Sequence, residues 1–238
     1  MIDQRFFMNK IKEFAATFLN LIYPSHCNFC KNKILDGDIY FCNECYKKLE
    51  YIEITDNQKH DLKCENLYSF FYFDHGSVSQ KIIHLIKYED KPNLGVKMGK
   101  EFGVKLSAHN ITADFIIPLP LHKSRHRDRG YNQSEVIAKG ISQILNIPVR
   151  CDIIKRNKYT QTQTKLGRKE RKVNVQGAFI LKHIDLTGKE IFLLDDVITS
   201  GATMNECIKL LEAQGAKKII PLSLALVRDI AGKFDILT

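Results

Sequence analysis

The chain has 238 residues, of which 44% are hydrophobic and 26% are charged, so it is neither a disordered tail nor a fibrous repeat. Its apolar runs fall short of the ~20 residues of a membrane-spanning helix, and charged residues scattered through the first fourteen positions argue against a signal peptide. The formal net charge is +9, and it is concentrated in residues 121–172, which carry +10 while the rest carries −1. We therefore expect a soluble cytoplasmic protein with one strongly basic region.

Residues 1–24 form the first predicted element. Apolar residues recur at helical spacing from Phe7 to Leu21, which predicts an amphipathic helix that Pro24 ends. We expect the apolar stripe to dock on the protein's own body, and attachment to a membrane surface is the alternative.

Four cysteines mark the second element, a small module and polar linker over residues 25–63. We expect each of two Cys-x-x-Cys pairs to lie on a tight turn, with a strand, a turn at Asp36-Gly37 and a second strand between the pairs. Two such pairs supply the four thiolates of a tetrahedral structural Zn²⁺ site, with no position left open for chemistry. A redox dithiol or a disulfide is the alternative, and Cys64 is an alternative ligand. The predicted ligands are Cys27, Cys30, Cys42 and Cys45.

In residues 64–238, short apolar strands alternate with amphipathic helices. The predicted strands are 66–73, 114–120, 148–154, 190–194 and 217–227, and the predicted helices are 77–89, 93–108, 132–145 and 203–214. This alternation is typical of an α/β domain with a largely parallel sheet and flanking helices, in which ligands bind beyond the carboxyl ends of the strands.

The basic region follows the second predicted strand. Arginines at every second position from Arg125 to Arg129 can line one face of an extended segment and make bidentate contacts with phosphate oxygens, and Tyr131 can stack on a base. Seven of the nine arginines lie in residues 121–172, which favours a polyanionic partner, either nucleic acid or a phosphorylated small molecule, over a merely solvated surface. The predicted DNA or phosphate contacts are Arg125, Arg127, Arg129, Tyr131, Asn132, Gln133, Lys155, Arg156, Lys169 and Arg171.

The strand 190–194 leads into two adjacent carboxylates and then into a loop of small and hydroxyl residues before a helix. Gly201 allows a ligand to approach the backbone closely, and the amino terminus of the helix favours a phosphate. The two carboxylates can accept hydrogen bonds from ribose hydroxyls or hold a hydrated Mg²⁺. The predicted ligand-binding residues are Asp195, Asp196, Val197, Ile198, Thr199, Ser200, Gly201, Ala202 and Thr203.

This loop resembles the phosphoribosyl pyrophosphate (PRPP) loop of type I phosphoribosyltransferases. The turn after the strand 114–120 resembles the loop that receives pyrophosphate in the same fold. The resemblance implies that PRPP binds with Mg²⁺ and that its pyrophosphate lies near Pro120, Leu121, His122 and Lys123.

The whole chain resembles the ComF family, the competence-associated, phosphoribosyltransferase-like proteins of naturally transformable bacteria. The similarity implies a zinc-finger module joined to a domain of the type I phosphoribosyltransferase fold. It also implies a role in handling incoming single-stranded DNA with a DNA translocase or helicase as partner, at the inner face of the membrane. The matching segments are the amino-terminal helix, the two cysteine pairs, Leu85-Ile-Lys87-Tyr88, Pro118 to His122, Arg125 to Gln133, Arg171 to Phe179 and Asp195 to Thr203.

Two functions stay open on the sequence. The first is a competence protein that handles single-stranded DNA and binds PRPP. The second is an active phosphoribosyltransferase, a pentosyl-transferring enzyme of nucleotide salvage or synthesis. The sequence identifies no catalytic residue, but phosphoribosyl transfer needs little beyond positioning, Mg²⁺ and charge stabilisation, so the lack of a recognisable base does not exclude catalysis. We favour the first function, because no segment that selects a particular base is recognisable.

Overall fold

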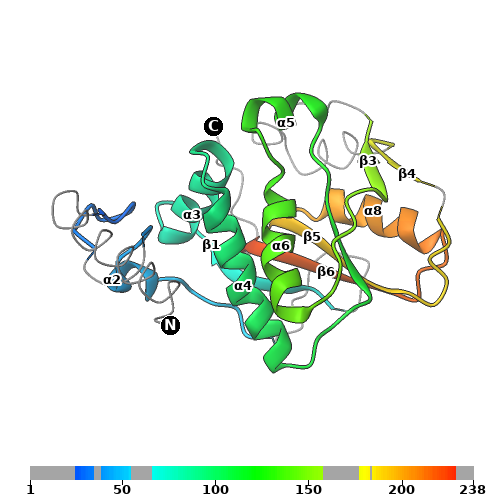
Figure 1. Ribbon diagram of the computed structural model, residues 1–238, viewed down its shortest axis with the longest axis horizontal. Coiled ribbons are helices and arrows are strands. Elements are labelled where there is room, and N and C mark those ends of the chain that lie inside the picture. Colours follow the sequence, from blue (N-terminus) through cyan, green and yellow to red (C-terminus); the bar gives the residue numbers. More distant parts are fainter. Residues whose placement is uncertain (1–24, 35–38, 55–65, 158–176, 183, 229–238) are drawn as a thin grey trace, which may run out of the picture. The chain divides into compact units, whose positions relative to one another are not determined.

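The computed structural model describes residues 25–34, 39–54, 66–157, 177–182 and 184–228 (Figure 1). The predicted helix in residues 1–24, the turn at Asp36-Gly37, most of the linker and Cys64 lie outside the described residues. The chain forms two compact units, Met1–Leu49 and Glu50–Thr238. In the described part of the chain, every helix is too short or too polar to span a bilayer.

A four-stranded sheet forms the centre of the larger unit. Its strands are β1 (Tyr68–Phe73), β2 (Phe115–Pro118), β5 (Glu190–Ile198) and β6 (Lys218–Val227). The strand order is β1-β6-β5-β2, and every neighbouring pair is parallel. The prediction of an α/β domain with a parallel sheet is therefore confirmed, and it follows from the short, continuously apolar strands of this chain.

Both edges of the sheet are partly covered. Beside β1, the Ile52 amide donates to the Phe70 carbonyl (3.1 Å) and the Tyr72 amide donates to the Glu50 carbonyl (2.9 Å). The larger unit thus begins at Glu50, earlier than the predicted start of the domain at residue 64. Beside β2, the predicted strand 148–154 is reduced to a single parallel bridge between Ile116 and Val149.

Helices cover both faces of the sheet. Apolar residues of α8 (Ala202–Glu212), such as Met204 and Ile208, pack with Ile117 of β2 and with Ile191 and Leu193 of β5. On the opposite face lie α3 (Val78–Tyr88), α4 (Pro92–Ala108) and α6 (Gln133–Leu145), with α4 and α6 side by side (Figure 1). These four helices match the predicted ones to within a few residues.

Glycines allow the backbones of α4 and α6 to touch. A Cβ atom on Gly99 would lie 2.1 Å from the Ile137 carbonyl oxygen, and one on Gly140 would lie 2.2 Å from the Val96 carbonyl oxygen. Either atom would overlap the facing helix, so only glycine fits at this crossing. The crossing fixes α6, whose amino end reaches the carboxyl edge of the sheet.

The larger unit also contains secondary structure that the sequence did not predict. The segment around Arg127, predicted to be extended, is the helix α5 (Lys123–Arg129). In addition, β3 (Ile154–Arg156) and β4 (Phe179–Leu181) form a separate antiparallel pair that the sequence did not reveal. The residues between these two strands are described only at 157 and 177–178.

Candidate functional site

The smaller unit brings the four predicted metal ligands together. The sulfur atoms of Cys27, Cys30, Cys42 and Cys45 all lie within 4.8 Å of one another, and the Cys30 and Cys42 sulfurs are 3.6 Å apart. Zinc–sulfur bonds of about 2.3 Å in a tetrahedron put neighbouring sulfurs roughly 3.8 Å apart. The cluster therefore fits a four-thiolate zinc ion.

The two cysteine pairs have different local structures. The first lies on a tight turn, as predicted, in which the Lys31 amide donates to the Cys27 carbonyl (3.0 Å). The second was predicted on a turn but starts the helix α2 (Asn43–Tyr46), with Cys42 as its N-cap. The predicted second strand is also wrong, because Ile39 and Tyr40 form a bend.

Backbone hydrogen bonds lower the pKa of one of the four thiols. Burial disfavours the Cys27 thiolate, but hydrogen bonds from the backbone of Cys42, Cys30 and Phe29 outweigh it and lower the pKa of Cys27 to about 6. Burial and the neighbouring thiols raise the pKa of Cys45 to about 12. A metal ion must therefore displace the Cys45 proton, because thiolates are the ligands of zinc.

In the larger unit, the acid pair lies inside strand β5, which continues to Ile198 instead of ending at Leu194 as predicted. Asp195 is paired in register with Ser223 of β6, and the Leu119 amide at the end of β2 donates to the Leu194 carbonyl (2.8 Å). The predicted pyrophosphate loop, residues 120–123, therefore begins beside the acid pair. After β5, Gly201 adopts a φ of 66° and caps the amino terminus of α8.

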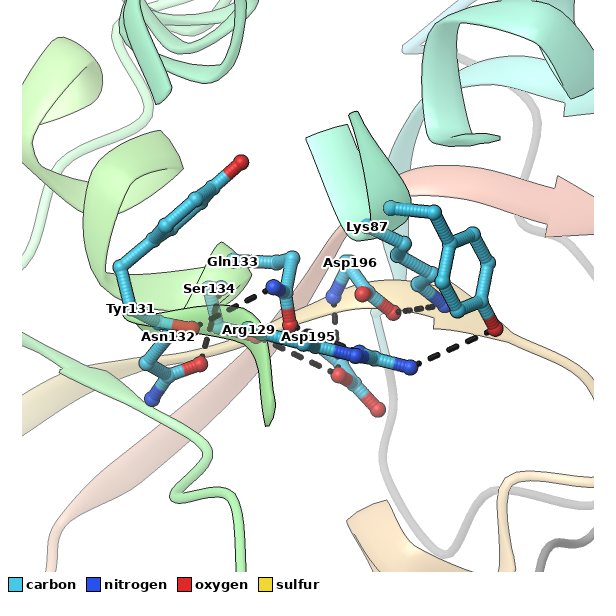
Figure 2. A network of polar contacts seen from close by, with 9 residues as sticks. Lys87, Arg129, Tyr131, Asn132, Gln133, Ser134, Asp195 and Asp196 are labelled. Carbon is cyan, nitrogen blue, oxygen red and sulfur yellow. Dashed lines mark hydrogen bonds and ion pairs between the residues drawn. The ribbon is translucent and has the colours of Figure 1, made fainter. Parts of the chain in front are cut away.

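The two carboxylates of the pair have different surroundings (Figure 2). Asp196 forms an ion pair with Lys87 (3.0 Å), in which both side chains are largely buried. Asp195 accepts hydrogen bonds from the Asp196 amide (2.8 Å) and the Ser134 hydroxyl (3.4 Å). Burial and the Asp196 carboxylate nevertheless raise the pKa of Asp195 to about 7.

The last turn of α3 lines the candidate site, and the sequence pattern did not predict this. Three consecutive residues reach across to other elements: the Ile86 carbonyl accepts from the Tyr131 hydroxyl (2.5 Å), Lys87 pairs with Asp196, and Tyr88 contacts Arg129. The sequence pointed to Lys87 and Tyr88 only because residues 85–88 form one of the segments that resemble the ComF family. Their partners lie at least 41 positions away, so no local pattern could have identified them.

The helical form of α5 divides the three arginines that were predicted to share one face. Residues four apart lie on the same side of a helix, so Arg125 and Arg129 are partly buried together, whereas Lys123 and Arg127 are exposed. Arg129 donates to Gln133 (2.9 Å). The Nη2 atom of Arg125 is buried and has no hydrogen-bond partner among the described residues.

Three neighbouring residues predicted as nucleic-acid contacts have internal partners in the structure. The Tyr131 hydroxyl binds Ile86, and Figure 2 shows its ring pointing away from the acid pair. Asn132 caps α6 and donates to the Leu119 carbonyl (3.0 Å). Gln133 is fully buried. These contacts position α6 against the loop that follows β2.

Of the remaining predicted contacts, Lys155 is exposed on β3, and Lys169 and Arg171 lie outside the described residues. Arg156 lies over the Phe179 ring, 5.2 Å from its centroid. Burial and the charge of Arg125 lower its pKa, and the charge of Asp195 opposes that effect. Two guanidinium groups and one carboxylate therefore influence one another at this end of the sheet.

Comparisons with known proteins agree with this arrangement. Residues 132–235 match the model of the phosphoribosyl transferase domain. Together with the parallel sheet and its flanking helices, this match shows the type I phosphoribosyltransferase fold, as predicted.

Three relatives carry names that contain the words competence or DNA utilization. "Competence protein F" of Haemophilus influenzae is 42% identical over 44% of this chain and 46% of its own length. "DNA utilization protein YhgH" of Shigella flexneri is 29% identical over 61% and 66%, and "Competence protein ComFC" of Streptococcus pneumoniae is 34% identical over 45% and 46%. The matches thus span between about half and two thirds of these relatives.

Proposed function

The chain belongs to the ComF family, and from this membership we propose that it is a competence protein that binds PRPP with Mg²⁺ and handles incoming single-stranded DNA in natural transformation. A DNA translocase or helicase is the proposed partner. The names of its relatives support the competence role. The observation that carries the ligand proposal is the order of strand β5, acid pair, Gly201 and helix α8.

In this proposal the 5′-phosphate of PRPP binds residues 199–203, where backbone amides and the dipole of α8 favour an anion. The ribose hydroxyls donate to Asp195 and Asp196, and the pyrophosphate lies near residues 120–123. Because Lys87 already neutralises Asp196, the Mg²⁺ ion is held mainly by the phosphates of the ligand and by Asp195. The ion supplies charge neutralisation for the pyrophosphate, and the four cysteines of the smaller unit hold a structural zinc ion.

Calorimetric titration of PRPP in Mg²⁺ tests the ligand proposal. The wild type should bind, and the double variant Asp195→Ala with Asp196→Ala should show no binding. Asp128→Ala, which removes a carboxylate from the exposed part of α5, is the control and should bind normally. Equal affinity in the wild type and the double variant would show that the acid pair does not hold the ribose.

For DNA, we propose that the exposed face of α5, with Lys123 and Arg127, and the exposed Lys155 of β3 contact the phosphates. Each phosphate contact with a single strand adds about −0.7 to the slope of log affinity against log salt. Lys123→Ala with Arg127→Ala should therefore weaken binding and flatten the slope by up to about 1.4.

The matched control removes two lysines from the amino ends of β5 and β6, at the opposite edge of the parallel sheet. Lys189→Ala with Lys218→Ala changes the net charge by the same amount and should leave the slope unchanged. Fluorescence anisotropy of a labelled oligonucleotide at several salt concentrations measures both. If the two double variants behave alike, the basic face does not bind DNA.

The same preparations distinguish the alternative function. An active phosphoribosyltransferase releases pyrophosphate from PRPP when its acceptor is present. Sustained release with a nucleobase, lost in the double variant of the acid pair, would replace the competence proposal with an enzyme of nucleotide salvage or synthesis.

A further inference from the structure

The strongest feature that the proposed function does not use is an exposed aromatic ring beside the acid pair. Tyr88 ends α3 and is 62% exposed, although Leu85 and Ile86 in the same helical turn are buried. The preceding residue, Lys87, contacts Asp196. An exposed tyrosine is common on protein surfaces, but this one directly follows the lysine that pairs with a carboxylate of the candidate ligand site.

A guanidinium group lies over this ring and is held in place. The Arg129 Cζ atom is 5.0 Å from the centroid of the Tyr88 ring, and its Nη2 atom is 3.4 Å from the tyrosine hydroxyl. The opposite nitrogen, Nη1, donates to the fully buried Gln133 (2.9 Å). Gln133 begins α6, which the glycine crossing with α4 fixes. The guanidinium plane is therefore anchored through the core, and the Tyr88 ring keeps most of its surface open.

We propose that Tyr88 and Arg129 form a stacking platform for a nucleobase. Aromatic rings and arginine planes are the two surfaces on which proteins stack unpaired bases. Both are present here, and the Arg129 guanidinium is held by Gln133. The platform takes over the stacking role that the sequence suggested for Tyr131, whose hydroxyl is bound to Ile86. The base comes either from single-stranded DNA or from a free nucleotide. The first of these assignments rests on the proposed function.

The absence of tryptophan from the chain makes a direct measurement possible. Tyr88→Trp keeps a stacking surface and introduces a unique fluorophore, which a stacked base quenches. Tyr72→Trp is the matched control, because Tyr72 also lies under an arginine, Arg228 at 4.2 Å, but on strand β1, two strands away from β5. The ligands are oligo(dT), an abasic oligonucleotide of the same length, and dTMP.

We expect oligo(dT) and dTMP to quench the reporter at position 88, the abasic strand to leave it unchanged, and the reporter at position 72 to respond to none of them. In the otherwise unchanged protein, Tyr88→Ala should weaken binding of oligo(dT) roughly 5- to 150-fold, because one stacked base contributes about that factor. Tyr88→Phe, which keeps the ring, should bind nearly as well as the wild type.

Different results overturn different conclusions. Quenching by dTMP without any binding of oligonucleotides keeps the platform, assigns it to a free nucleotide and removes the DNA-handling function. Binding of oligo(dT) and of the abasic strand with equal affinity, together with an unchanged reporter at position 88, keeps DNA binding and overturns the platform. The platform is also overturned if neither oligo(dT) nor dTMP quenches the reporter.

Discussion

Asp195 and Asp196 are neighbours in sequence, yet their carboxylates lie in different electrostatic environments. Asp196 is neutralised by Lys87 at 3.0 Å, whereas burial and the neighbouring carboxylate disfavour the charged form of Asp195. Lys87 belongs to α3 and the Ser134 hydroxyl that contacts Asp195 belongs to α6, so different helices supply the partners of the two carboxylates. This difference has a measurable consequence for the dependence of stability on pH.

The pKa of Asp195 is about 7 in the folded protein, above its ordinary value of 3.8. Between these values the folded protein holds a proton that the unfolded chain releases, so the stabilising contribution of this residue falls as the pH rises and is lost above pH 7. Asp195→Asn should match the wild type near pH 4 and exceed its stability above pH 7 by about 2–4 kcal/mol. Urea denaturation at a series of pH values measures the difference.

Asp152→Asn is the control of opposite sign. The hydrogen bond and charge of Arg150 lower the pKa of Asp152 to about 2, so its contribution to stability is present above pH 4 and is lost as the pH falls through 2. This variant should be less stable than the wild type at neutral pH. A gain in stability at neutral pH for both variants would mean that the surroundings of Asp195 are not what raises its pKa.

Lys87 permits a second test at the level of single residues. Lys87→Met leaves the largely buried Asp196 without its cation, which should lower the free energy of unfolding by about 1–3 kcal/mol. Adding Asp196→Asn should restore most of the loss, because the uncompensated charge is then gone. Urea denaturation of the four proteins in this cycle gives the coupling directly. Additive effects of the two substitutions would contradict the ion pair.

The candidate site was only partly predictable from the sequence. Asp195 to Thr203 are contiguous, so their order on a strand, a loop and a helix can be read from the sequence. Lys87 and Tyr88 belong to a different helix, and only the packing of α3 brings them to the acid pair. The Cys-x-x-Cys spacing likewise predicted the ligand cluster, because each pair holds two thiols close together, on a turn in the first pair and at the start of α2 in the second.

Among the elements, the crossing of α4 and α6 has the tightest steric requirement. An alanine at Gly99 would place its Cβ atom 2.1 Å from a backbone carbonyl, whereas one at Gly103 would lie 3.0 Å from the side chain of Ile144. Gly99→Ala should lower the free energy of unfolding by about 1–3 kcal/mol, as overpacking does. Gly103→Ala should change it by less than about 1 kcal/mol, because the helix propensity of alanine offsets the milder contact.

Thermal or urea denaturation of the two alanine variants checks this prediction, and each serves as the control of the other. Both substitutions replace a glycine inside the same helix, so any effect of propensity is shared. Equal stabilities of the two variants would mean that the helices can move apart at no cost.

The long elements were predictable because their apolar periodicity extends over many residues. The helix α5 was not, because seven residues hold fewer than two turns and the alternating arginines imitate a strand. Its boundaries are nevertheless encoded: the His122 side chain accepts from the Ser124 amide, and Gly130 ends the helix with a φ of 76°. The pairing of β3 with β4 joins segments on either side of residues 158–176, a separation that local patterns do not report.

At the scale of the whole molecule, the division into Met1–Leu49 and Glu50–Thr238 predicts two separable losses of structure. Cys27→Ser with Cys30→Ser should remove one zinc ion per chain and unfold the smaller unit, because small zinc modules have little core of their own. The larger unit should keep its fold and the proposed binding of PRPP. Elemental analysis and hydrogen exchange of the two units measure these outcomes.

The variant Cys151→Ser with Cys207→Ser is the control for the zinc prediction, because these cysteines belong to the larger unit and are not part of the sulfur cluster. It should keep one zinc ion per chain. Full zinc content in the Cys27 and Cys30 variant would contradict the assignment of the ligands.

The position of β1 in the sheet also governs how the chain is made. Its partner β6 is the last described strand, and the buried hydrogen bond between Ser69 and Ser223 joins residues 154 positions apart. A ribosome adding about 5–20 residues per second needs roughly 8–30 s to cover that distance. During an interval of this length the aromatic segment Tyr68–Phe73 lacks the strand with which it pairs. A nascent chain of this protein therefore exposes to chaperones an apolar early segment, which pairs only after β6 has been made.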